Sequence, residues 1–447
     1  RIVAAINEML DIDLEVIDYP EGDFQKLTVS IASGDIPDVL TAKYPSETVL
    51  SWIDDGIIIP IDPYFDEIPT IRDRLVNDLS WTAVDGHYYG YVFIETSANA
   101  GMIMRKDWLD KLGLAEPTTT DEMAEVLRAF TFDDPDGNGV NDTYGISDTK
   151  PNSFLPPLWM LYAFDVAHSD WSVDENGKVI PVFEDPGYKQ AIEYYLQLIQ
   201  AGVVEPEAFM NDRGALEQKW AQGKVGLMYG AMFRNYARHA NTVISVNPSA
   251  VPTYAKDAIK GPNGSKGFAA TPTSGLITMV TSEAKDPLKA AKFIELLLSP
   301  EGRNLLENGI EGIHYDVGAD GKIIYHEEER AKENFAANGW AHPLAWGHVV
   351  WPLTEMYIPD TDPDKAACVD TARIATENMV PMLIPYTVPE TLEANQIGTI
   401  PVDYYMMMIN GEMDIDKAIE ELGVKWRNAG GQNQLEGAQR EYDSLNK

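Results

Sequence analysis

The most explicit chemical pattern in this sequence is a twelve-residue run from Asp134 to Gly145. An EF-hand-type calcium loop takes oxygen ligands from positions one, three, five, seven and nine, and it turns sharply at a glycine in position six. Gly139 occupies position six here, and the other positions are filled, in order, by Asp134, Asp136, Asn138, Val140 through its carbonyl, and Asp142. The spacing therefore predicts one bound Ca²⁺ with a structural role.

The last position of the loop departs from the pattern. Gly145 stands where a bidentate carboxylate normally closes the calcium shell. The missing ligand is expected from a second oxygen of Asp142, from Asp133, from Thr143 or from water. Asp, Asn, Gly and Pro also form ordinary solvated turns, so an acidic turn without metal is the alternative. A helical pattern over Asp121–Phe130 precedes the loop, and no second helix is evident after it. This favours a calcium site that stabilises the structure over one that senses calcium.

Composition limits the classes of function. The 447 residues exceed one ordinary core, so two domains are expected. With 34 basic and 71 acidic residues the net charge is −37, which argues against nucleic-acid and membrane-surface binding and mildly against a polyanionic ligand. The single cysteine excludes an intramolecular disulfide. No apolar run is long enough to span a membrane. Because Arg1 is not a natural start, we expect the natural chain to begin before it.

The order of elements indicates an α/β protein. An alternating strand at Leu14–Ile17, a helix at Phe24–Ala32 and a short apolar strand at Ile36–Leu40 predict a parallel sheet with crossover helices. A strongly periodic helix over Leu288–Leu298 returns to the same pattern, and Gly318–Lys322 is expected to turn a hairpin.

The chain contains several short motifs in a particular order over most of its length. They are Lys26-Leu27 followed by Ser33-Gly34-Asp35-Ile36-Pro37-Asp38, Asp85-Gly86 with Tyr89-Gly90, Arg105 to Leu114 with Pro117-Thr118, the loop Asp134–Gly145, Gly223-Lys224-Val225-Gly226, the Asp286-Pro287 helix ending at Ser299-Pro300-Glu301-Gly302, and Gly309-Ile310-Glu311-Gly312. In this set and order the chain resembles the extracellular solute-binding proteins of carbohydrate ABC transporters, in the family one, lipoprotein-type group.

The resemblance implies an α/β, two-lobe, periplasmic-binding-protein-like fold of type II, with hinge strands between the lobes. Crossings near 94–97, 272–275 and 326–330 would assign 1–95 and 275–328 to lobe one, and 97–273 and 329–447, with the calcium loop, to lobe two. It also implies a monomer that binds an oligosaccharide or other sugar in the interlobe cleft and delivers it to ABC permease subunits. Such a protein is extracellular and tethered to the outer face of the cell membrane by a lipid.

A sugar site needs aromatic platforms with polar groups at their edges. Trp108, Trp426 and Trp52 lie in helical patterns and are expected to pack in the core. Candidates in loops or at strand ends are Tyr44, Glu95, Trp159, Tyr229, Phe233, Trp340, Trp346 and Trp351. For each aromatic residue, core packing is the competing interpretation.

The sequence contains none of the common catalytic motifs: no zinc-protease helix, nucleophile elbow, Walker loop or dinucleotide fingerprint is present. The prediction is therefore a binding protein and not an enzyme. The alternative is a glycoside-active enzyme, a hydrolase or lyase that uses cleft carboxylates, and Glu95 is its first candidate. A calcium-dependent adhesion module would need several calcium loops, and only one is present.

Overall fold

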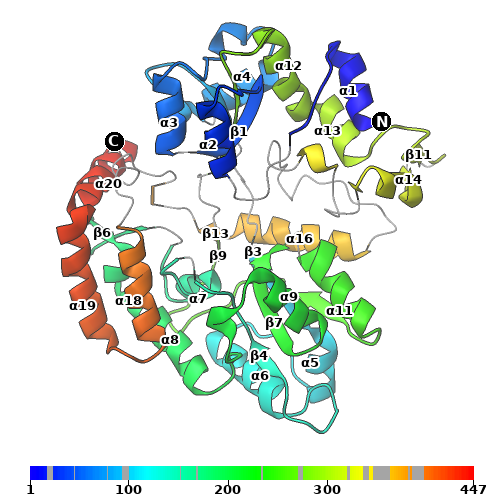
Figure 1. Cartoon of the computed structure of the whole chain (residues 1–447). Helices are drawn as coiled ribbons and strands as arrows, with labels where there is room; N and C mark the ends of the chain where they lie inside the picture. Colours follow the sequence, from blue (N-terminus) through cyan, green and yellow to red (C-terminus); the bar gives the residue numbers. More distant parts are fainter. Residues whose placement is uncertain are drawn as a thin grey trace. The chain divides into compact units, whose positions relative to one another are not determined.

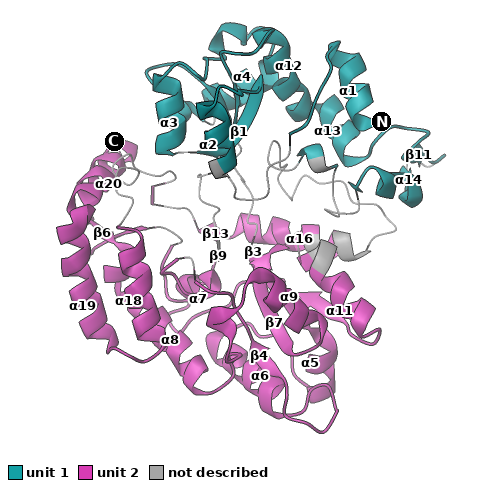
Figure 2. Ribbon diagram, in the orientation of Figure 1, with its two compact units in different colours: residues 1–94, 274–351 teal, residues 95–273, 352–447 magenta. Residues whose placement is uncertain are grey.

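The chain forms two compact units. The structure is a computed structural model, which describes residues 1–17, 24–44, 46–77, 79–92, 100–151, 153–167, 170–232, 235–269, 275–319, 323–335, 342–345, 363–380, 383–384 and 397–446. Unit 1 comprises 1–94 and 274–351, and unit 2 comprises 95–273 and 352–447 (Figure 2). The lobes expected from the sequence are 1–95 with 275–328 and 97–273 with 329–447. They differ from the two compact units mainly at the third boundary.

Unit 1 contains a small sheet with helices around it (Figure 1). Its principal elements are α1 (Ile2–Leu10), α2 (Phe24–Ala32), β1 (Val39–Tyr44), α3 (Glu47–Asp54), α4 (Pro69–Asn77), β2 (Gly90–Val92), β10 (Gly275–Val280), α12 (Pro287–Leu298), α13 (Pro300–Glu307), β11 (Tyr315–Val317), β12 (Ile323–Tyr325) and α14 (Glu327–Lys332). The Asp286 carboxylate accepts the Lys289 N–H, and Pro287 sets the first helical φ, so α12 starts where the sequence predicts.

The strand order in unit 1 is β1-β10-β2, and β10 is antiparallel to both neighbours. Alternate residues of these strands face two cores. Leu40, Ala42 and Ile277 pack with α2 and α3, whereas Tyr91 and Val280 pack with α1, α4 and α12. Unit 1 is therefore a helix–sheet–helix sandwich.

The predicted parallel sheet in this region is wrong. Residues 12–17 form no strand, and Val16 and Ile17 are 50% and 54% exposed. β1 and β2 run in the same direction, but β10 lies between them after the chain has returned from unit 2. A strand that pairs with residues more than two hundred positions away leaves no local signal of its direction. The hairpin expected around 318–322 is confirmed as the antiparallel pair β11–β12.

The third boundary differs from the prediction because residues after 328 pack in unit 1. Phe335 and Leu344 are 1% and 7% exposed in the core that α12 and α13 share. Arg330 donates to the carbonyls of Glu307 and Asn308, at 3.2 and 2.8 Å, at the end of α13. Its guanidinium also stacks 4.0 Å from the ring centre of Tyr325. These contacts hold α14 to unit 1.

Unit 2 is larger and is described by itself (Figures 1 and 2). Its principal elements are β3 (Ala100–Arg105), α5 (Lys106–Leu112), α6 (Thr120–Phe132), β4 (Tyr144–Ile146), α7 (Leu158–Ala163), β5 (Trp171–Val173), β6 (Val179–Pro181), α8 (Pro186–Gln200), α9 (Arg213–Ala221), β7 (Val225–Ala231), the π-helix η5 (Asn235–Ala240), α11 (Asn241–Val246), β8 (Pro252–Tyr254), β9 (Phe268–Ala269), α16 (Pro363–Glu377), β13 (Met379–Val380), α18 (Thr399–Ile409), α19 (Ile415–Trp426) and α20 (Gln432–Leu445).

The main sheet of unit 2 has the order β4-β7-β3-β8. β4 is parallel to β7, and β3 is antiparallel to both β7 and β8. One face of the sheet packs on a large core shared with α7, α8, α18 and α19. The other face packs on α5 and α6 through Trp108 and Phe130, whose ring centres are 5.3 Å apart. As expected, Trp108, Trp426 and Trp52 are core residues, 1%, 5% and 6% exposed.

The Arg330 contacts predict a large effect of a conservative change in unit 1. Arg330→Lys keeps the charge but loses the planar fork that reaches two carbonyls and stacks on Tyr325. We expect it to lower the free energy of unfolding by about 1–3 kcal/mol, because hydrogen bonds made by charged groups contribute on this scale. Urea denaturation followed by tryptophan fluorescence measures the change.

Arg373→Lys is the matched control, because Arg373 is an exposed residue that pairs with exposed Asp370 at 3.2 Å. Equal denaturation midpoints for Arg330→Lys and the wild type would show that α14 is not held by this clamp.

Candidate functional site

Two of the predicted aromatic residues lie at or near strand ends that border the crossings between units. In unit 1, Tyr44 ends β1 and pairs with Gly275, the first residue of β10. In unit 2, Tyr229 lies near the end of β7 and pairs with Met102, near the start of β3. Each unit thus presents a predicted residue on the edge from which the chain leaves it.

Tyr44 is 5% exposed and packs in the core beside α3. Its hydroxyl donates to the Thr82 carbonyl at 3.5 Å, and burial raises the pKa of the phenol. In this conformation its ring offers no open face to a sugar.

Trp159 and Tyr229 belong to one apolar cluster in unit 2. Trp159 is 3% exposed and packs edge-on against Tyr194, with 6.0 Å between ring centres. Its indole N–H is buried without an acceptor among the described residues. Tyr229 is only partly buried, and burial raises its pKa. Of these two rings, that of Tyr229 is the more exposed.

The remaining predicted sugar-site residues cannot be placed. Glu95, Phe233, Trp340, Trp346 and Trp351 all lie outside the described residues.

The predicted calcium loop folds on its own polar groups. Asp134 accepts the N–H groups of Gly137 and Gly139, at 3.1 and 3.2 Å. The Asn138 amide donates to Asp136 at 2.8 Å and to Asp142 at 3.2 Å, so an N–H₂ group lies between two carboxylates. Among the described residues, no group of three or more His, Cys, Asp or Glu side chains converges to hold a metal. The oxygen donors fit a hard cation in kind, and in this conformation they are turned onto the loop's own donors.

Lysine side chains also neutralise the loop. Lys224, just before β7, pairs with Asp142, and Lys111 from α5 donates to the Asp134 carbonyl at 3.1 Å. Hydrogen bonds from Lys224 and from Asn138 lower the pKa of Asp142. The Lys224 ammonium therefore supplies a positive charge to Asp142, and the neutral Asn138 amide supplies hydrogen bonds to Asp136 and Asp142.

The structure explains why position twelve is a glycine. A Cβ on Gly145 would lie 2.6 Å from the Leu127 carbonyl oxygen, because α6 packs directly on β4. The Thr143 hydroxyl donates to the Phe130 carbonyl at 2.8 Å, and Asp133 pairs with Arg128 at 2.7 Å. Of the four expected sources for the missing ligand, Asp133, Thr143 and Asp142 all have protein partners in this conformation, and water is the fourth.

A family model described as bacterial extracellular solute-binding protein matches residues 2–304, which is more than half of the chain. The chain belongs to this family. It is 25% identical over 448 residues to the polygalacturonan/rhamnogalacturonan-binding protein YtcQ of Bacillus subtilis, covering 96% of this chain and 86% of YtcQ. It is 26% identical over 457 residues to lipoprotein LipO of the same species, covering 97% and 86%.

A solved structure of the Streptococcus pneumoniae ABC-transporter substrate-binding protein FusA, in complex with kestose, superposes with a TM-score of 0.71 and 23% identity, covering 100% of this chain and 95% of FusA. Another structure of FusA is described as an EF-hand mutant and gives the same TM-score. These matches confirm the predicted family and the two-lobe α/β fold. No described helix is both long and apolar enough to cross a membrane.

Sequence reasoning overlooked Asp148, two residues beyond the end of β4. Ser147-Asp148 directly follows the short strand Tyr144–Ile146. A polar residue at the carboxyl end of a strand in an α/β sheet is the signal that would have identified it.

The close packing at Gly145 predicts a specific destabilisation. Gly145→Ala forces α6 away from β4 and should lower the free energy of unfolding by about 1–3 kcal/mol, the usual cost of overpacking a core. Gly398→Ala is the control, because Gly398 has helical φ and no atom lies within 4 Å of the position that its added methyl group would take. Differential scanning calorimetry of both variants is the measurement, and a Gly145→Ala protein as stable as the control would contradict the packing.

Proposed function

We propose that this protein binds an oligosaccharide and delivers it to the permease subunits of an ABC importer. The main support is the match to the family of bacterial extracellular solute-binding proteins over residues 2–304, and a relative named polygalacturonan/rhamnogalacturonan-binding protein matches 96% of the chain. FusA, named as a fructooligosaccharide ABC transporter substrate-binding protein, is 28% identical over 319 residues. Within unit 2, partly exposed Tyr229 provides an aromatic face of the kind that stacks on a sugar ring.

Binding without turnover is part of the proposal. The family is one of solute-binding proteins, and the sequence has none of the common catalytic motifs. The protein acts as a monomer outside the cell. A lipid anchor, as the name of LipO suggests for that relative, would hold it at the outer face of the membrane.

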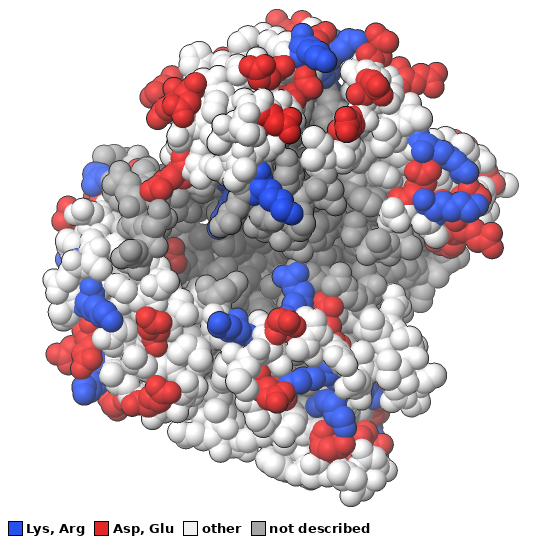
Figure 3. Space-filling model, viewed as in Figure 1, with Lys and Arg blue, Asp and Glu red and all other residues white. Residues whose placement is uncertain are grey.

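The charge distribution favours an uncharged sugar, unlike the polygalacturonan for which the relative YtcQ is named. The net charge is −37, and on the face shown in Figure 3 acidic and basic side chains are interspersed, with no broad basic surface among its described residues. A polyuronate would approach this protein against a repulsive field.

The proposed function is tested by a thermal-shift screen against neutral oligosaccharides, followed by calorimetry with the best ligand. Tyr229→Ala should weaken the binding of that ligand by at least ~1 kcal/mol, about fivefold in Kd, because it removes an aromatic ring on which the sugar stacks. Tyr442→Ala is the matched control, since Tyr442 is a partly buried tyrosine of unit 2 on α20.

If no sugar of a broad panel raises the melting temperature, the proposed function is contradicted. A Tyr229→Ala variant that binds as tightly as the wild type would move the platform to another residue.

We further propose that the loop Asp134–Gly145 binds one Ca²⁺ through Asp134, Asp136, Asn138, the Val140 carbonyl and Asp142. Bound calcium would supply a fixed positive charge to this acidic loop. The oxygen donors of the loop support the proposal, as does the solved EF-hand mutant of FusA.

Calcium at about one hundred times its Kd should stabilise the protein by about 2.7 kcal/mol, and chelation should remove that stabilisation without unfolding the chain. Thermal melts with calcium and with chelator measure it. Asp134→Ala should abolish the response. Asp133→Ala should retain it, because Asp133 pairs with Arg128. Identical melts of the wild type with calcium and with chelator would overturn the calcium proposal.

A further inference from the structure

A carboxylate that the sequence analysis overlooked lies on the edge of the unit 2 sheet that also presents Tyr229. Ile146 ends β4 and pairs in parallel with Leu227 of β7. Asp148 follows the last residue of β4 by two positions, and Tyr229 follows Leu227 by two positions within β7. Both residues therefore lie at the carboxyl ends of parallel neighbouring strands, where open α/β sheets bind ligands.

The Asp148 carboxylate is half-buried and lacks a cationic partner. It accepts the Thr149 N–H at 2.8 Å and the Tyr195 hydroxyl at 3.4 Å. No Lys or Arg of the described residues forms an ion pair with it. Burial raises its pKa, which is the expected effect of enclosing a carboxylate without a counter-charge.

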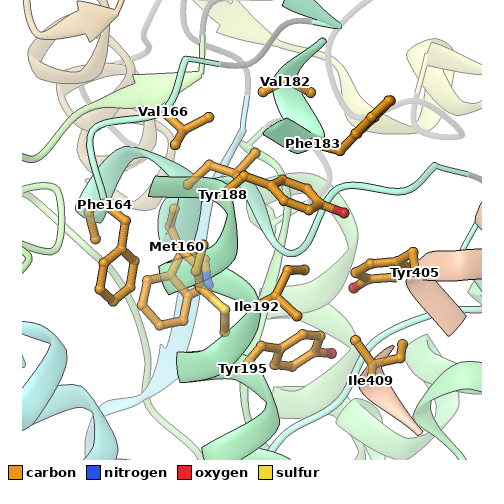
Figure 4. Packing of buried hydrophobic residues seen from close by; sticks show 14 of the residues in the cluster. Met160, Phe164, Val166, Val182, Phe183, Tyr188, Ile192, Tyr195, Tyr405 and Ile409 are labelled. Atoms are coloured by element: carbon orange, nitrogen blue, oxygen red, sulfur yellow. The ribbon is translucent and has the colours of Figure 1, made fainter. Parts of the chain in front are cut away.

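Tyrosines from two helices surround this carboxylate. Tyr195 comes from α8 and Tyr405 from α18, and Figure 4 shows their hydroxyl ends directed toward one another. The pKa values of both phenols are raised well above their ordinary value, chiefly by burial and next by the charge of Asp148. Neither phenol ionises near neutral pH, so Asp148 is the acidic group of this cluster that loses its proton first.

A buried polar network fixes the backbone around Asp148. The Asn211 side-chain amide donates to the Asp148 carbonyl at 3.2 Å and to Glu205 at 2.9 Å, and the backbone carbonyl of Asn211 accepts the Lys150 N–H at 2.8 Å. Lys219 completes the network by donating to Glu205 at 3.0 Å. The segment is held on both sides of Asp148, so the position of the carboxylate is set before any ligand arrives.

We infer that Asp148 is a ligand-binding carboxylate that accepts hydrogen bonds from sugar hydroxyls and selects neutral over acidic oligosaccharides. An ionised carboxylate has about four acceptor positions, and two are occupied here. The remaining acceptor positions of the carboxylate need hydrogen-bond donors, and the hydroxyl groups of a neutral sugar supply them. A uronic acid would instead place a second carboxylate near the first, in a half-buried site where like charges repel strongly.

A binding role and a structural role predict opposite effects on stability. The folded-state pKa of Asp148 is raised above its unfolded value, so ionisation of this carboxyl destabilises the fold, and the cost falls as the pH drops through the folded pKa and is gone below the unfolded pKa. Asp148→Asn removes the charge with almost no change of shape. It should raise the melting temperature of the ligand-free protein at neutral pH while it weakens sugar binding.

The inference rests on the proposed function, and its test uses the full chain with kestose, maltotriose and xylotriose as neutral probes and trigalacturonate as the acidic probe. Calorimetry compares the wild type, Asp148→Asn and Glu175→Gln. Glu175 is an exposed carboxylate in the turn between β5 and β6, so its variant carries the same charge change.

We expect Asp148→Asn to bind the neutral ligand about tenfold more weakly than the wild type does. The variant should also show a smaller preference for the neutral ligand over trigalacturonate and a higher melting temperature. Glu175→Gln should change none of these.

Unchanged affinity and preference in Asp148→Asn, or a lower melting temperature with unchanged affinity, would overturn the inference while the sugar-binding function remained. A wild type that binds none of the neutral probes but binds trigalacturonate would overturn the neutral selectivity. A wild type that binds no sugar at all would contradict the proposed function and this inference together.

Discussion

The register of one long-range strand pair in each unit determines which side chains lie on the sheet edge next to the crossings. In unit 1, β10 arrives from distant sequence and pairs so that its first residue, Gly275, meets the last residue of β1, Tyr44. In unit 2, Ala100 of β3 meets Ala231 of β7. Because a strand exposes alternate residues, a shift of one residue in either pair would turn Tyr44 or Tyr229 to the opposite face. The hydrogen-bonded registers thus fix which side chains border the crossings.

Close helix–sheet packing in unit 2 connects this edge to the acidic loop. α6 lies against the sheet at glycines, since a Cβ on Gly226 would overlap the Phe130 ring and one on Gly145 would meet Leu127. The loop between α6 and β4 therefore has no side chain at its position twelve for a steric reason. Lys224 links the same loop to the start of β7, the strand that presents Tyr229 at its far end.

The sequence was sufficient for features that depend on local patterns. The helix before the acidic loop, expected at Asp121–Phe130, is α6 at Thr120–Phe132, and the tryptophans in helical patterns are buried as expected. The boundaries of the two compact units at 94 and 273 lie within two residues of the crossings that the family resemblance implies.

The sequence was insufficient where distant residues decide the outcome. The direction of β10 depends on its partners, and the third boundary depends on Phe335 and Arg330 packing on α13. The importance of Asp148 arises from Tyr195, Asn211 and a parallel register with β7, none of which is local to it. Five of the predicted sugar-site residues lie outside the described part of the chain, so those predictions stay predictions.

A crystal structure of the full chain, grown with the neutral oligosaccharide that raises the melting temperature most, tests the central claim most directly. We predict a sugar ring stacked on Tyr229, with hydroxyls within hydrogen-bonding distance of the Asp148 carboxylate. A sugar bound away from the carboxyl ends of β4 and β7 would contradict this assignment.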